Sequence, residues 1–149
     1  MNFKIFNKKE SLRLLERIKE QFGIKELKLD YGFIQNNDKI YLISKDIAKI
    51  NYKELRINDI GLYFCTIMNN GIRLSIEGSQ LIGKNATKNV VEISDEELKC
   101  WFNGENLVRK DIFGYVLIKN KDDFLGCGYA KEGVIINYVP KERRVKELI

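Results

Sequence analysis

Most of the chain after residue 60 consists of short apolar segments separated by tight polar turns, and this spacing limits the possible folds more than any other feature. Asn70-Gly71 is a strong hairpin signal, and it separates an expected strand over Ile60–Met68 from a returning strand over residues 72–76. Many short strands at close spacing are typical of a small barrel or pseudo-barrel. Three more strands are expected at Phe113–Lys119, Phe124–Ala130 and Val134–Val139.

The start of the chain has a different pattern, with apolar residues at helical spacing. This spacing predicts a helix over Lys8–Phe22. Asn7 and Glu10 fit a capping box at its start, and Gly23 offers the left-handed conformation that ends many helices. Two strands and a short helix are expected next, at Leu27–Phe33, at Lys39–Ile43 and after Ser44.

These patterns predict an α+β protein in two parts. Residues 1–57 are expected to form a small N-terminal α/β unit, and residues 58–149 a β pseudo-barrel with short helices. One of these helices is expected over Gly78–Gly83. Another follows Ser94, which forms a second capping box with Glu97.

The chain of 149 residues has 26 Lys+Arg, 21 Asp+Glu and no histidine, which gives a net charge of +5. The lack of histidine excludes a Ser-His-Asp triad, a Cys-His pair and a histidine-ligated zinc. We therefore expect a protein that is not an enzyme. Residues 1–57 hold 13 Lys+Arg and 8 Asp+Glu, whereas residues 58–149 hold 13 of each, so the excess positive charge lies in the first part.

The three cysteines, Cys65, Cys100 and Cys127, lie within apolar runs and form no CxxC pair. Their number is odd, so neither a disulfide framework nor a zinc knuckle is expected, and they are interpreted as buried thiols. No metal or cofactor is expected. The chain has no apolar stretch of the roughly 20 residues that a membrane span needs, and no signal peptide is evident at Met1. The expected location is the cytoplasm, with no membrane contact.

Two basic clusters are the strongest candidate binding residues. One consists of Lys84 and Lys88, and the other of four cations near the end of the chain, which are Lys141, Arg143, Arg144 and Lys146. Arginine can form a two-pronged contact with phosphate, so both clusters could bind a nucleic-acid backbone. For the second cluster a solvated tail is an equally good interpretation.

Other motifs favour structural roles. Gly126-Cys127-Gly128 lacks the third glycine of a dinucleotide loop, so a close backbone approach is favoured. Asp122 and Asp123 fit a solvated turn better than an acid–base pair. Trp101 is expected in the core. The aromatic residues on the expected strands are Tyr63, Phe64, Tyr115 and Tyr129. Most of them are also expected to be buried, although one or two could stack on bases.

Four features follow one another in residues 61–147, which are Gly71–Gly78, Lys88–Ile93, the helix around Trp101, and the strand pair Gly114–Ile118 with Phe124–Gly128. With these features the segment resembles a PUA domain, a small RNA-binding pseudo-barrel. With the segment Asp38–Ser44, the whole chain also resembles the two-domain Nip-seven family of ribosome assembly factors. The segment Phe124–Arg144 is similar to the end of the carboxy-terminal region of Sun-type RNA cytosine-5 methyltransferases. The chain lacks the catalytic cysteine motif and the cofactor-binding domain of those methyltransferases, so its cysteines inherit no catalytic role.

The resemblance implies RNA contact at the short helix after the second strand of the PUA domain and at the neighbouring sheet edge. Carried over, this assigns RNA binding to Arg73, Gly78, Lys84 and Lys88. The Nip-seven family implies a role for the basic cluster at the end of the chain. The leading hypothesis is therefore a non-enzymatic protein that docks on structured rRNA or tRNA during ribosome assembly or RNA modification.

The alternative is an accessory subunit that recruits an RNA-modifying enzyme, such as a cytosine-5 methyltransferase, through protein contacts of residues 1–57. The expected partners are thus structured RNA and, in the alternative, a ribosome-assembly or RNA-modification protein.

Overall fold

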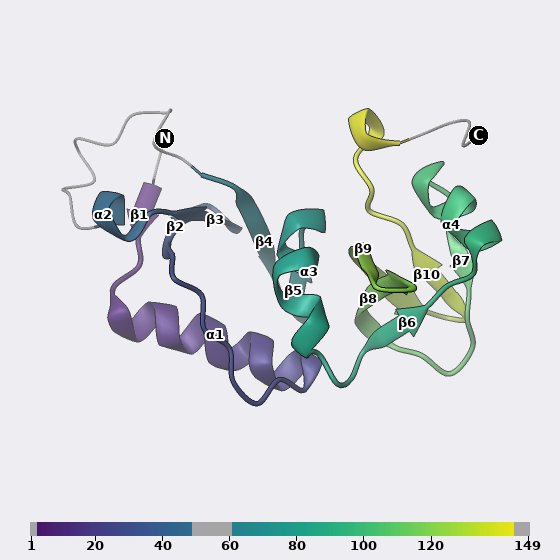
Figure 1. The fold of residues 1–149 in the computed structure, drawn as a ribbon, viewed down its shortest axis with the longest axis horizontal. Helices are drawn as coiled ribbons and strands as arrows, with labels where there is room; N and C mark the ends of the chain where they lie inside the picture. Colours follow the sequence, from purple (N-terminus) through teal and green to yellow (C-terminus); the bar gives the residue numbers. More distant parts are fainter. Residues whose placement is uncertain (1–2, 49–60, 145–149) are drawn as a thin grey trace.

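The computed structural model describes residues 3–48 and 61–144, which form two five-stranded sheets with short helices around them (Figure 1). The first sheet has the order β1-β2-β3-β4-β5, and the second has the order β6-β8-β9-β10-β7. The strands of the first sheet are β1 (Phe3–Ile5), β2 (Gly32–Asn36), β3 (Lys39–Ile43), β4 (Tyr63–Met68) and β5 (Gly71–Leu74). Those of the second are β6 (Val90–Glu92), β7 (Leu107–Val108), β8 (Gly114–Asn120), β9 (Asp123–Lys131) and β10 (Val134–Ile136).

Helix α1 (Lys8–Phe22) packs against the first sheet and confirms the prediction from its periodicity. The Asn7 side chain accepts a hydrogen bond from the Glu10 N–H at 2.8 Å, and the Glu10 carboxylate accepts one from the Asn7 N–H at 3.0 Å. Gly23 has a φ of 63°, the left-handed conformation expected at the helix end. The helix buries Leu14, Ile18 and Phe22 in the core.

The register of the first sheet separates an apolar face from a charged one. Because directly opposed residues share one face of a sheet, the partners Ile40, Cys65 and Leu74 lie together, and all three belong to the core with α1. One residue away, Lys39 is opposite Thr66, which is opposite Arg73. Successive side chains on a strand point to opposite faces, so the row of Lys39, Thr66 and Arg73 lies on the face away from α1.

Two expected elements differ in the structure. The strand expected at Leu27–Phe33 is wrong, because the ladder runs over Gly32–Asn36. Leu27 and Leu29 satisfy their apolar pattern by packing on the core from an irregular segment. The returning strand ends at Leu74 instead of continuing to Ile76, because the Ser75 hydroxyl accepts a hydrogen bond from the Gly78 N–H at 2.9 Å and starts a helix there.

The second sheet curls into a half-barrel, which agrees with the expected α+β class and with a PUA-like pseudo-barrel. β6 pairs with β8 in parallel, and the other neighbours are antiparallel. Helix α4 (Asp95–Phe102) begins with the predicted Ser94–Glu97 capping box. It places Trp101, which is fully buried as expected, over β9, where the indole N–H donates to the Leu125 carbonyl at 3.4 Å.

Helix α3 (Ile76–Ile82) and the short helix η3 (Gly83–Asn85) connect the two sheets, and Figure 1 shows α3 between them. Side chains from β8 and β9, including Leu117 and Phe124, belong to the same core cluster as Ile72 of β5 and Phe22 of α1. The two sheets therefore share one core.

The expected boundary between residues 57 and 58 lies outside the described residues and stays a prediction. β4 and β5, on its C-terminal side, are hydrogen-bonded into the first sheet. In the described part of the chain, no helix has the length and apolar character to cross a membrane.

Candidate nucleic-acid interface

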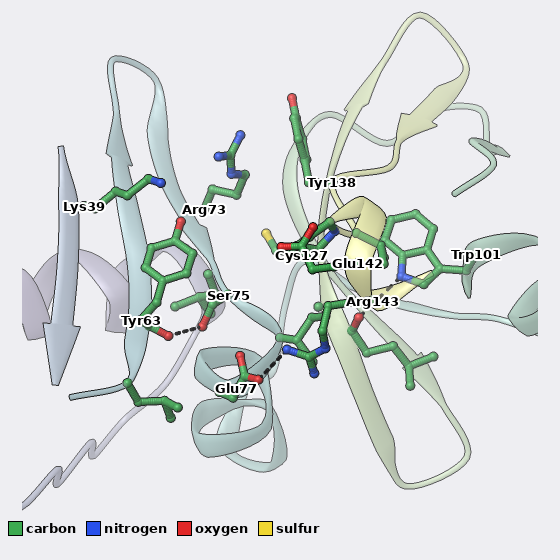
Figure 2. Close-up of a pocket in the computed structure, with 17 residues that line it drawn as sticks. Lys39, Tyr63, Arg73, Ser75, Glu77, Trp101, Cys127, Tyr138, Glu142 and Arg143 are labelled. Atoms are coloured by element: carbon green, nitrogen blue, oxygen red, sulfur yellow. Dashed lines mark hydrogen bonds and ion pairs between the residues drawn. The ribbon is translucent and has the colours of Figure 1, made fainter. Parts of the chain in front are cut away.

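A cavity of about 540 Å³ lies between the two sheets, and we call it the inter-sheet groove (Figure 2). One wall comes from β3, β4 and β5, and the other from β9 and the segment that follows β10. The first residues of α3 also line it. The side chains that bring charge, aromatic surface or hydrogen-bonding groups to the groove are Lys39, Tyr63, Arg73, Ser75, Glu77, Tyr138, Glu142 and Arg143.

One end of the groove is cationic and aromatic. The Lys39 ammonium lies 5.6 Å from the centre of the Tyr63 ring, and the Arg73 guanidinium lies 4.3 Å from the centre of the Tyr138 ring. Figure 2 shows Lys39 and Tyr63 on one side of the gap and Tyr138 on the other, with Arg73 pointing into the space between them. Among the described residues, neither Lys39 nor Arg73 forms an ion pair with a carboxylate.

The other end is closed by an ion pair. Arg143 Nη1 lies 2.7 Å from Glu77 Oε1, which joins the C-terminal segment to the first turn of α3. Ser75 donates a hydrogen bond to the Tyr63 carbonyl at 2.7 Å, so the turn before α3 is held against β4. This end carries no excess positive charge, because Glu77 offsets Arg143 and Glu142 adds a further carboxylate to the lining.

The C-terminal segment is fixed on the second sheet by side-chain hydrogen bonds. Asn137 Nδ2 donates to the Trp101 carbonyl at 2.7 Å and to the Glu105 carbonyl at 3.0 Å, while its Oδ1 accepts from the Val139 N–H at 2.7 Å. Arg144 Nε donates to the Val139 carbonyl at 3.1 Å. These bonds place Tyr138 and the short helix η4 (Lys141–Arg143) at the rim of the groove.

The structure brings two of the predicted RNA-binding residues, Arg73 and Arg143, together in the groove. Lys141 is exposed on η4, and Arg144 lies beside Gly104. Gly78 is buried in α3, where an added Cβ would lie 2.4 Å from the Phe64 carbonyl oxygen. This geometry gives Gly78 a packing role, and its role in RNA binding stays a prediction.

The cluster of Lys84 and Lys88 lies in a different place from the groove. Both are exposed, and they lie on the segment that joins α3 to β6, at the lower edge of Figure 1, whereas η4 lies at the upper edge. The N–H groups of Thr87 and Lys88 donate to the Phe22 carbonyl at 2.9 and 3.2 Å, so the segment also caps the C-terminal end of α1. Lys146 lies outside the described residues.

Three motifs have the structural roles expected from the sequence. Cys65 and Cys127 are buried, and burial raises the pKa of each thiol to about 12, so both are poor nucleophiles at neutral pH. Asp122 lies exposed in the β8–β9 turn, directly before β9 begins. Gly128 allows the expected close approach, because an added Cβ would lie 2.4 Å from Ile135 Cγ2.

The third thiol, Cys100, is half-buried. Burial and the nearby Glu105 carboxylate raise its pKa as well. Over residues 3–48 and 61–144, no group of three or more Cys, Asp and Glu side chains is placed to hold a metal ion.

Sequence reasoning missed Lys39 and Tyr138 as site residues. Lys39 begins a strand, and only the β3–β4–β5 register places it in one row with Arg73. Tyr138 lies two residues before Pro140 and the basic run. Its nearness to this predicted phosphate-binding cluster is the sequence signal that could have identified it as a site residue.

A surface that combines unpaired cations with accessible tyrosine rings is typical of nucleic-acid-binding proteins. Comparison with known families agrees with this class, since residues 88–145 match the family described as methyltransferase RsmF PUA domain. The match covers about two fifths of the chain and supports a PUA-domain protein. A PUA domain is an RNA-binding module rather than a catalytic one. No curated protein matches the chain.

Proposed function

We propose that this protein binds structured RNA without catalysing a reaction on it, and that it acts on rRNA or tRNA during ribosome assembly or RNA modification. The observation that carries the proposal is the PUA-domain match, which overlaps the segment of η4 and Arg143 at the groove. The groove supports it with Lys39 and Arg73, two cations that no described carboxylate offsets.

Phosphate contacts supply most of the affinity in this proposal. Lys39, Arg73 and Lys141 face solvent or the groove and would bind backbone phosphates, while the RNA is selected by its shape. Arg143 and Arg144 are less available, because each already makes a hydrogen bond within the protein. We also propose that the chain has the two-domain layout of the Nip-seven family and that it is related to the carboxy-terminal region of Sun-type methyltransferases.

The test is binding to a structured RNA over a series of salt concentrations. The double variant Lys39→Gln, Arg73→Gln is expected to bind more weakly, and the slope of log K against log salt is expected to fall by about one for each lost contact. Lys131→Gln, an exposed cation at the end of β9 outside the groove, is the matched control. If the intact protein binds no structured RNA even at low salt, the proposal is wrong.

A second candidate function is that of an accessory subunit for an RNA methyltransferase. It is favoured because the description of the matched family names a methyltransferase. The intact chain, purified from its own cells under mild conditions, is then expected to carry RNA cytosine-5 methyltransferase activity. Deleting residues 1–57 is not a suitable test, since it removes three strands of the first sheet together with α1, which contributes to the shared core. Lack of methyltransferase activity in the purified material would contradict this candidate.

A further inference from the structure

We propose that the inter-sheet groove holds one unpaired nucleotide of the bound RNA, with its base beside Tyr63 and Tyr138 and its phosphate beside Lys39 and Arg73. The inference rests on the proposed RNA binding and adds the part of the RNA that this site takes. It concerns a groove formed jointly by both sheets rather than the family-matched segment alone.

The size of the groove selects an unpaired nucleotide. Sites for small ligands typically enclose roughly 300–1,000 Å³, and the groove, at about 540 Å³, is within this range. A double helix is far too wide to enter it. A base that has left its stack can enter, and single-stranded bases of this kind are commonly held on aromatic side chains.

The aromatic rings are placed on the two opposing walls. Tyr63 lies on β4, where its ring is 5.7 Å from that of Tyr41 and its hydroxyl contacts Thr66, so it is held in place from both sides. Tyr138 is 37% exposed on the C-terminal segment. Figure 2 shows the two rings on either side of the groove, with Arg73 between them. Stacking of a base on such a ring contributes about 1–3 kcal/mol.

The distribution of charge favours one end of the groove for the phosphate of the nucleotide. Lys39 and Arg73 provide positive charge at one end, whereas the Glu77–Arg143 pair and Glu142 leave the other end without excess positive charge. A phosphate is therefore favoured at the first end, where Tyr63 and Tyr138 also lie. The Arg73 guanidinium lies 4.3 Å from the centre of the Tyr138 ring, so a phosphate bound to Arg73 would lie close to that ring.

The test compares two hairpin RNAs that share one stem, one blunt and one with a single-stranded extension of about four nucleotides. The intact protein is expected to bind the extended hairpin about 10-fold more tightly, as one stacked base allows. Tyr138→Leu should lose most of this preference. Tyr138→Phe, which keeps the ring, should retain the preference.

Tyr31→Leu is the matched control, because Tyr31 is 43% exposed and does not line the groove. Its preference for the extension should equal that of the intact protein, and thermal unfolding verifies that each variant is folded. Equal affinity of the intact protein for both hairpins overturns the inference while the proposed function stands. Binding to neither hairpin overturns the proposed function. Preferential binding of a polyglutamate peptide that displaces the extended hairpin assigns the groove to an acidic protein partner and also overturns the inference.

Discussion

At the scale of single residues, the ion pair between Glu97 and Arg109 is the strongest charge interaction of α4. Arg109 Nη1 lies 2.5 Å from Glu97 Oε2, and Nη2 lies 2.9 Å from Oε1, so the contact is two-pronged. Arg109 directly follows β7, and the pair therefore ties the start of α4 to that strand. The hydrogen bonds from Arg109 lower the pKa of Glu97 from 4.5 to about 2.

This shift predicts a dependence of stability on pH. Because the carboxylate is favoured in the folded state, its contribution is complete above pH 4.5 and is lost as the pH falls from 4.5 to about 2. Glu97→Gln should lower the free energy of unfolding at pH 7 by about 1–2 kcal/mol, a value reduced for the partial exposure of the pair. Its stability should also decline less steeply than that of the intact protein between pH 4.5 and 2.

Urea unfolding followed by the fluorescence of Trp101, the single tryptophan, measures both effects. Glutamine still accepts the hydrogen bond from the Ser94 N–H, so the helix cap is preserved and the ion pair alone is tested. Glu96→Gln, in the same helical turn and exposed, is the control. Equal stability of the two variants at pH 7 would contradict the prediction.

At the scale of elements, the edge strand β5 is completed by a side chain of α1. Gln21 Nε2 donates to the Ile72 carbonyl at 2.7 Å, and the Ile72 N–H donates to Gln21 Oε1 at 2.9 Å. β5 is the last strand of the first sheet, so these Ile72 groups have no neighbouring strand to pair with. The glutamine side chain acts in place of that strand and protects the edge.

Gln21→Ala is expected to lower the free energy of unfolding by about 1–3 kcal/mol, because it leaves a buried N–H and a buried carbonyl of Ile72 without partners. Glu20→Ala, an exposed neighbour on the same helix, should change it by less than about 0.5 kcal/mol. Urea unfolding measures the difference. Equal losses in the two variants would show that helix propensity, rather than the contact with β5, sets the cost.

The elements that the sequence predicted well are those with local signals. α1 and α4 begin at capping boxes, and the β4–β5 hairpin turns at Asn69-Asn70, one residue before the predicted Asn70-Gly71, so a few neighbouring residues determine each of them. The strand at Leu27–Phe33 was wrong because alternation also fits an irregular segment that packs on a core. The short strands β1 and β7 were missed, since pairing partners distant in the sequence define them.

At the scale of the whole molecule, the core cluster that joins the two sheets determines how the chain unfolds. Residues of α1, β4, β5, β8 and β9 contribute to this cluster, while Trp101 lies in a second cluster built around the second sheet. Loss of either sheet exposes apolar side chains of the other. The described parts of the chain are therefore expected to unfold as one unit.

Two probes can test this expectation. Far-UV circular dichroism is dominated by α1, the longest described helix, and Trp101 fluorescence reports on the second cluster. The two unfolding curves in urea should coincide. A fragment of residues 58–149 should be much less stable than the whole chain, since it leaves Phe64, Cys65 and Ile72 uncovered. Two separate transitions would contradict a shared core.

The candidate site could be predicted only in part, because contacts between residues far apart in the sequence define its geometry. Arg73 and Arg143 were found from charge and resemblance, but their approach across the groove depends on how two sheets pack. Lys39 carries no local signal for binding, and the signal at Tyr138 is its nearness to the basic run; the register of the first sheet and the bonds of Asn137 position the two side chains. Nonlocal pairing is the information that a single sequence does not display.

The two walls of the groove come from regions that are far apart in the chain, with Lys39 at one extreme and Arg143 at the other. In evolution, such a site has to be inherited as a whole. A gene fission or recombination event between β5 and β9 would separate the walls and abolish the groove, even if every residue of both halves were retained. Among descendants of this chain, substitutions at Tyr63 and Tyr138 should therefore be correlated rather than independent.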